Sequence, residues 1–131
     1  MTFPIVRVSE WRMRRRFNRG RYYERVLSGG LQTRLKDTHP TRTKANEPYC
    51  TRTQEVFYID PTTGQEVARV HQYLRTDGTL GASGLPDPKS IVENAIMYRL
   101  RKPPSSLLER IRYSLSDWRD RLYWKIGVEV D

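Results

Sequence analysis

Two β-forming segments separated by a tight turn indicate that this chain builds a sheet. Residues 55–60 are mostly β-branched and aromatic, and residues 65–75 alternate apolar with polar positions along most of their length. Between them, Pro61-Thr62-Thr63-Gly64 has the composition of a turn. A second turn signal, Thr76-Asp77-Gly78-Thr79, follows the second segment. We therefore expect a small antiparallel sheet around residues 50–80.

The C-terminal part of the chain predicts a long amphipathic helix over residues 105–127. Its apolar side chains recur at spacings of three and four residues, at Leu108, Ile111, Leu115, Trp118 and Leu122. Ser106 and Glu109 have the spacing of a capping box at its start. We expect this stripe to pack on the protein's own sheet, and the alternative is a docking helix for a partner or a second copy.

A shorter helix is predicted after Asp87-Pro88, because Asp is a good N-cap and Pro suits the first helical position. We expect it to cover residues 88–94. Residues 95–101 fit either a continuation of this helix or, after a turn at Asn94, a third strand. With 131 residues and 37% hydrophobic content, the chain has room for one core. The expected fold class is α+β, with a basic arm and linker over 1–49 and a compact domain over 50–131.

Most of the net charge lies in the first 36 residues. This segment holds ten Lys or Arg against two acidic residues, a net of +8 out of +9 for the whole chain. Like charges gathered in one segment repel each other, so the cluster indicates a polyanion or an acidic protein surface as the partner.

The same segment predicts a strand-like entry followed by two short amphipathic helices. Ser9 is a suitable N-cap, Gly20 interrupts the helical pattern, and Gly29-Gly30 ends it. Residues 31–54 contain few apolar side chains, so we expect a long loop or an extended arm there. The basic N-terminal arm is thus predicted to lie partly outside the core.

One face of the strand over 65–75 carries a cationic and aromatic stripe. Strand alternation places four such side chains together, namely Arg69, His71, Tyr73 and Arg75. Sheets that bind RNA or single-stranded DNA present surfaces of this kind, in which rings stack on bases and arginines contact phosphates. An ordinary solvent-facing strand is the alternative, because Arg and Tyr are common on exposed sheet faces.

A small metal-independent ribonuclease is a further hypothesis. The roles would fall to His71 as general base and to Arg69 or Arg75 as stabiliser of a phosphorane, with Tyr58 or Ser83 nearby. The only other histidine, His39, lies in the loop-like region, so the sequence favours a role without catalysis.

No motif indicates a metal site or a cofactor, because the two histidines are 32 positions apart and the acidic residues are scattered. The single cysteine, Cys50, excludes an internal disulfide. The sequence has neither an apolar run of about 18 residues, as a membrane span needs, nor a secretory signal. The expected location is the cytoplasm, or the host cytoplasm if the gene is viral.

Together these features predict a nucleic-acid-binding protein within a larger assembly, with RNA or single-stranded DNA favoured over a specific duplex sequence. Phosphate contacts are expected from the arm, through Arg12, Arg14, Arg15, Arg16, Arg19 and Arg21. The alternative is a structural or adaptor protein that binds other proteins through the arm and the C-terminal helix. Its expected interface residues are aromatic or apolar, namely Trp11, Phe17, Trp118 and Leu122.

Overall fold

The computed structural model describes residues 2–101 together with residues 111, 115, 118, 119 and 122. Within residues 2–101, six strands form one sheet and two short α-helices pack against it. The strands are β1 (Ile5–Val8), β2 (Gln32–Pro40), β3 (Arg52–Ile59), β4 (Glu66–Leu74), β5 (Asp87–Glu93) and β6 (Ile96–Leu100). The helices are α1 (Glu10–Arg19) and α2 (Tyr22–Leu27), and a 3₁₀ turn covers Thr43–Ala45.

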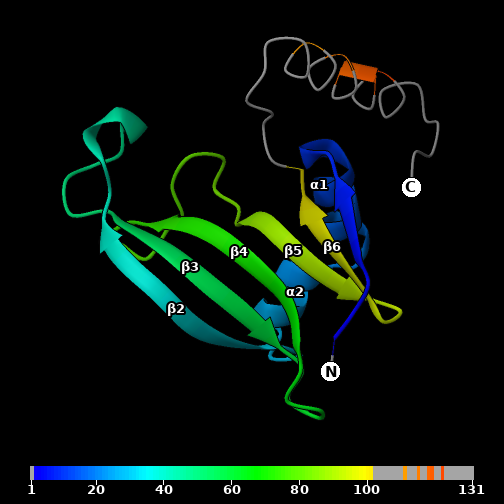
Figure 1. Cartoon of the computed structure of the whole chain (residues 1–131). Coiled ribbons are helices and arrows are strands. Elements are labelled where there is room, and N and C mark those ends of the chain that lie inside the picture. The colour runs from blue at the N-terminus through cyan, green and yellow to red at the C-terminus, as the bar shows by residue number, and fades with distance from the viewer. Residues whose placement is uncertain (1, 102–110, 112–114, 116–117, 120–121, 123–131) are drawn as a thin grey trace.

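The sheet is mixed, with the strand order β1-β6-β5-β4-β3-β2. β1 runs parallel to β6, and every other neighbouring pair is antiparallel. β1 and β2 therefore occupy opposite edges, and the two helices that connect them cross one face of the sheet (Figure 1). The opposite face, turned toward the viewer in Figure 1, carries neither α1 nor α2. We call it the helix-free face.

The core lies between the sheet and the two helices. Met13 of α1, Val70 of β4 and Ile91 of β5 have no exposed surface. Phe17 of α1 and Tyr58 of β3 face each other with ring centroids 6.2 Å apart. Burial of each large apolar side chain stabilises the fold by about 1.5–3 kcal/mol.

The N-terminal segment belongs to this core, so the prediction of a basic arm partly outside it was wrong. The two predicted helices are present, and the Ser9 hydroxyl caps α1 by accepting a hydrogen bond from the Arg12 N–H at 3.3 Å. Gly20 ends α1 as predicted. The helices pack inward because Met13 and Phe17 lie one helical turn apart on the same face of α1.

The sheet is also larger than predicted. Residues 32–40, expected to be loop or arm, form β2 and pair with β3 along the edge of the sheet. The helix predicted over 88–94 is strand β5, which continues through a two-residue turn at Asn94 and Ala95 into β6. The alternative of a turn and a further strand after Asn94 is therefore confirmed.

The prediction of a long C-terminal helix packed on the sheet is not supported. Most of residues 105–127 lie outside the described residues. The four described apolar members of the stripe, Ile111, Leu115, Trp118 and Leu122, are helical, and their side chains are exposed. No helix in the described part of the chain is both long and apolar enough to span a membrane.

Candidate nucleic-acid interface

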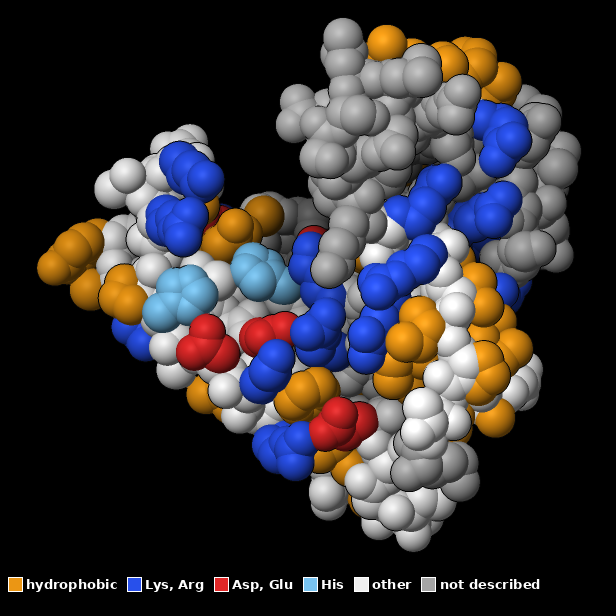
Figure 2. All heavy atoms as spheres, in the orientation of Figure 1, with side chains coloured by type: hydrophobic (Ala, Val, Ile, Leu, Met, Phe, Trp, Pro, Cys, Tyr) orange, Lys and Arg blue, Asp and Glu red, His pale blue; other side chains and the backbone are white. Residues whose placement is uncertain are grey.

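β4 shows the alternation that sets up the helix-free face. Ala68 and Val70 are buried against the helices, whereas Arg69, His71 and Tyr73 are half-buried on the other face. Figure 2 shows this face, on which both histidines are visible among basic and acidic side chains.

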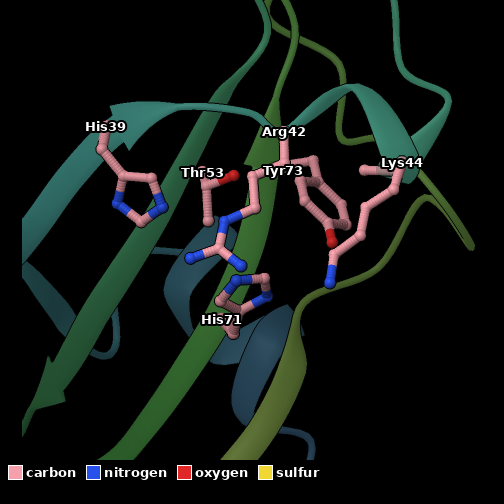
Figure 3. Close-up of a pocket in the computed structure, with 7 residues that line it drawn as sticks. His39, Arg42, Lys44, Thr53, His71 and Tyr73 are labelled. Atoms are coloured by element: carbon pink, nitrogen blue, oxygen red, sulfur yellow. The ribbon is translucent and has the colours of Figure 1, made fainter.

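A pocket of about 420 Å³ lies on the helix-free face, where the connection between β2 and β3 bends over the sheet (Figure 3). Its lining residues come from three strands and this connection, and they are His39, Arg42, Lys44, Ala45, Thr53, His71 and Tyr73. In Figure 3 the side chains of His39, Arg42 and His71 converge on this pocket. The fold thus brings both histidines of the chain into one pocket, which we call the histidine pocket.

A buried carboxylate holds the β2–β3 connection against the sheet. The Glu47 side chain is only 4% exposed and pairs with the Arg75 guanidinium, with 3.1 Å between Oε2 and Nη2. Its Oε1 also accepts a hydrogen bond from the Ala82 N–H at 2.7 Å. The hydroxyls of Thr41 and Thr53 are hydrogen-bonded at 2.9 Å near the start of the connection. These contacts hold in place the backbone segment that carries Arg42 and Lys44.

Arg42 and Lys44 differ from most basic side chains of this face because neither forms an ion pair among the described residues. The nearby cations are paired with carboxylates, Arg34 with Glu66, Lys36 and Arg69 with Glu55, Arg75 with Glu47, and Lys89 with Asp87. Among the described residues that line the pocket there is no Asp or Glu. Two positive charges that form no ion pair among the described residues favour an anionic ligand.

His71 sits in an environment that favours its neutral form. Its ring packs edge-on against Tyr73, with 5.2 Å between centroids. Partial burial lowers the pKa of His71 below its ordinary value of 6.5, and the positive charge of Lys89 lowers it further, although Asp87 and Glu55 act in the opposite direction. A neutral imidazole at neutral pH can accept a proton from a ligand.

His39 is held differently, by a carboxylate of its own strand. Its Nδ1 lies 3.2 Å from Oδ2 of Asp37. A carboxylate only accepts, so Nδ1–H is the donor and Nε2 is the ring nitrogen left for a ligand. The His39 side chain is 50% exposed, which leaves it accessible from solvent.

Only two of the four residues in the predicted stripe on β4 line this pocket. His71 and Tyr73 line it, and Arg69 lies on the same face in a 2.9 Å ion pair with Glu55. Arg75 is turned to Glu47 and supports the β2–β3 connection instead.

The arginines predicted to form a phosphate-binding arm lie on or next to α1, and none of them lines the histidine pocket, although Arg14 shares a neighbouring hollow with His71 and Tyr73. Arg14 donates to the carbonyl of Pro86 at 2.7 Å, and Arg16 pairs with Glu93 and covers the ring of Tyr98 at 3.7 Å. Three others also form interactions, namely Arg12, Arg15 and Arg19. Arg21 is exposed at the start of α2. Arg14 and Arg16 therefore fasten α1 to the β5–β6 part of the sheet.

The predicted protein-interface residues have separate environments. Phe17 is in the core at 3% exposure, and Trp11 is half-buried beside Glu10 and Arg14. Trp118 and Leu122 are exposed at 61% and 39%.

Sequence reasoning did not connect His39, Arg42 and Lys44 with His71. The available signal was the threonine content of residues 33–43, since Thr favours strands and would have placed His39 in the sheet. Among the described residues, no group of three His, Cys, Asp or Glu side chains is arranged to hold a metal ion. Comparisons of this chain with protein-family models, curated proteins and solved structures found no match.

Proposed function

We propose that this protein binds single-stranded nucleic acid, RNA above all, on the helix-free face of its sheet. The observation that carries the proposal is the histidine pocket, where Arg42 and Lys44 stand over a lining whose described residues include no carboxylate. The paired cations around it are already neutralised by acidic neighbours, so the attraction for phosphate is concentrated at these two side chains.

The pocket and its rim offer both kinds of contact that a single strand requires. Arg42 and Lys44 would donate hydrogen bonds to phosphate oxygens, and the rings of His71 and Tyr73 would contact a base or ribose. Tyr49, on the same connection, is 94% exposed and shares a neighbouring hollow with Arg42. An aromatic ring so exposed is suited to stacking on the next base.

Salt-dependent binding tests this proposal. We expect a fluorescent oligouridine of about twelve nucleotides to bind with an affinity that falls with salt, by roughly 0.7 logarithmic units per phosphate contact for each tenfold change in salt. The double variant Arg42→Ala/Lys44→Ala should reduce this slope by about 1.4, since two contacts are lost. Fluorescence anisotropy at several salt concentrations measures both quantities.

Arg34→Ala is the matched control, because Arg34 is an exposed arginine of the same sheet that is paired with Glu66. It should leave the slope unchanged. Tyr49→Ala should weaken binding several-fold without altering the slope, because stacking is not electrostatic. A protein that does not bind oligouridine, or binds it equally at all salt concentrations, contradicts the proposal.

The adaptor hypothesis keeps one observation in its favour, the exposed helical side chains of Leu115, Trp118 and Leu122. If they dock on a partner protein, that binding should survive high salt and be lost in Trp118→Glu. Because Trp118 is exposed, this variant should keep the circular dichroism spectrum of the parent. Pull-down at about 0.5 M salt distinguishes this mode from phosphate binding.

A further inference from the structure

We propose that the histidine pocket also cleaves the RNA strand it binds, by transferring a phosphodiester from the 5′ oxygen of one nucleotide to the 2′ oxygen of its neighbour. This inference rests on the proposed RNA binding. The substrate class is single-stranded RNA, because DNA lacks the attacking 2′ hydroxyl.

The first argument is the arrangement of the side chains around Arg42. The guanidinium of Arg42 and the imidazoles of His39 and His71 converge on one pocket, which all three groups line (Figure 3). A phosphate held there by the planar fork of Arg42 would have both imidazoles within the same pocket, which allows one to face the entering oxygen and the other the leaving oxygen. In-line displacement at phosphorus needs a proton acceptor at the entering oxygen and a proton donor at the leaving oxygen, on opposite sides of the phosphate.

The second argument is that the two imidazoles have unlike surroundings, which suits them to unlike roles. His71 is half-buried, near Lys89, and its lowered pKa keeps it neutral at neutral pH, as a proton acceptor requires. His39 is half-exposed and hydrogen-bonded through Nδ1 to Asp37. That carboxylate orients the ring of His39 and leaves Nε2 to donate when the ring is protonated.

The step balances without another reagent. His71 removes the proton of the 2′ hydroxyl as O2′ forms its bond to phosphorus. The bond between phosphorus and O5′ breaks, and His39 gives a proton to the departing O5′. The products are a 2′,3′-cyclic phosphate and a free 5′ hydroxyl. Extra negative charge on the phosphoryl oxygens in the transition state is stabilised by Arg42 and Lys44, for which no described carboxylate competes in an ion pair.

The test is incubation of the full chain, without a histidine tag, with end-labelled oligouridine in EDTA. We expect fragments that end in a 2′,3′-cyclic phosphate, identified by mass spectrometry. His71→Gln and His39→Asn should each lower the cleavage rate by about 100-fold or more, since each removes one proton-transfer group. Arg34→Gln, purified in parallel, should cleave at the parental rate, which shows that a substitution on this sheet and the purification do not by themselves change the rate.

Binding is measured separately with 2′-O-methyl oligouridine, which has no free 2′ hydroxyl and cannot be cleaved in this way. His39→Asn should bind this analogue within a few-fold of the parent. His71→Gln should bind it more weakly, because a ring contact is lost, so its cleavage rate is measured at saturating RNA. Binding of the analogue without cleavage of oligouridine overturns this inference and leaves RNA binding standing. Cleavage at equal rates in the parent and both histidine variants also overturns it. Failure to bind either oligonucleotide removes the proposed function as well.

Discussion

Glu47 is the residue that links the β2–β3 connection to the far end of β4. Its carboxylate contacts Arg75 and the backbone of Ala82, and its side chain is almost completely buried. A Cβ added at Gly81 would overlap this carboxylate, which explains why a residue without a side chain stands there. Strand alternation predicted Arg75 as part of the binding stripe. Its ion pair with Glu47 was missed because a local pattern carries no information about an ion-pair partner 28 positions away in the sequence.

Removing the charge of Glu47 should destabilise the protein and loosen the histidine pocket. Glu47→Gln leaves the Arg75 guanidinium without its carboxylate, at a cost of about 1–3 kcal/mol in the free energy of unfolding. Urea denaturation measures this change. Glu66→Gln is the control, because the Arg34–Glu66 pair is exposed and should contribute about 0.5 kcal/mol or less. Equal effects of the two substitutions would contradict the structural role of Glu47.

The lowered pKa of His71 makes a prediction about stability and pH. In the unfolded chain this histidine titrates near its ordinary pKa of 6.5, whereas in the folded protein its pKa is lower. As the pH falls through about 6.5, the unfolded state therefore takes up this proton first, and stability is lost until the pH drops below the folded pKa. Above a pH of about 6.5, His71 is neutral in both states and its titration no longer changes the free energy of unfolding.

Urea denaturation of the parent and His71→Gln, at about pH 7.5 and about pH 5.5, tests this assignment. The charged groups around His71, namely Glu55, Asp87, Lys89 and His39, remain in both proteins. The parent should lose more stability on acidification than the variant. A greater loss in the variant would reverse the assigned direction.

Among the elements, β5 shows how local and non-local signals compete. Asp87-Pro88 resembles a helix start, yet Pro88 pairs with Val70 at an irregularity in the β4–β5 register. A proline has no N–H to give to a ladder, and such irregularities are among the few places where strands tolerate it. The turn after β5 was indicated correctly by Asn94, a residue type that favours turns. β2 was missed for a different reason, because an edge strand with mostly exposed side chains lacks the apolar alternation used to recognise strands.

The β5–β6 turn gives a stabilising substitution. Asn94 and Ala95 have φ of 51° and 62°, the left-handed conformation that type I′ hairpins require at both positions. Alanine is strained there, so Ala95→Gly should raise the free energy of unfolding by about 0.5–1 kcal/mol. Ala45→Gly is the control, since Ala45 lies in the 3₁₀ turn and is absent from the positive-φ positions. It should lower stability, and a stabilising effect at Ala45 would show that the gain is unrelated to φ.

At the scale of the molecule, the fold gives the basic N-terminal segment a structural role that its charge alone did not predict. The sequence shows how many arginines this segment holds, but it does not show that two of them form ion pairs with carboxylates of β5. Arg14 reaches Asp87 and Arg16 reaches Glu93, at opposite ends of that strand. The two pairs position α1 on the sheet. What the sequence could establish was the pair of strands β3 and β4 and the two short helices, because their signals lie within a few residues of one another.

The packing of α1 on the sheet makes the N-terminal segment indispensable, and Met13 is the place to test this. Met13 is completely buried, so Met13→Ala should lower the free energy of unfolding by about 2–5 kcal/mol through lost contacts and a cavity. Leu27→Ala in α2 is the control, because Leu27 is 70% exposed and its truncation should change stability by about 0.5 kcal/mol or less. Thermal and urea denaturation measure the change in the free energy of unfolding for both variants. Had this segment been an arm outside the core, Met13→Ala would be as harmless as the control, and a small effect would overturn the description of α1 as part of the core.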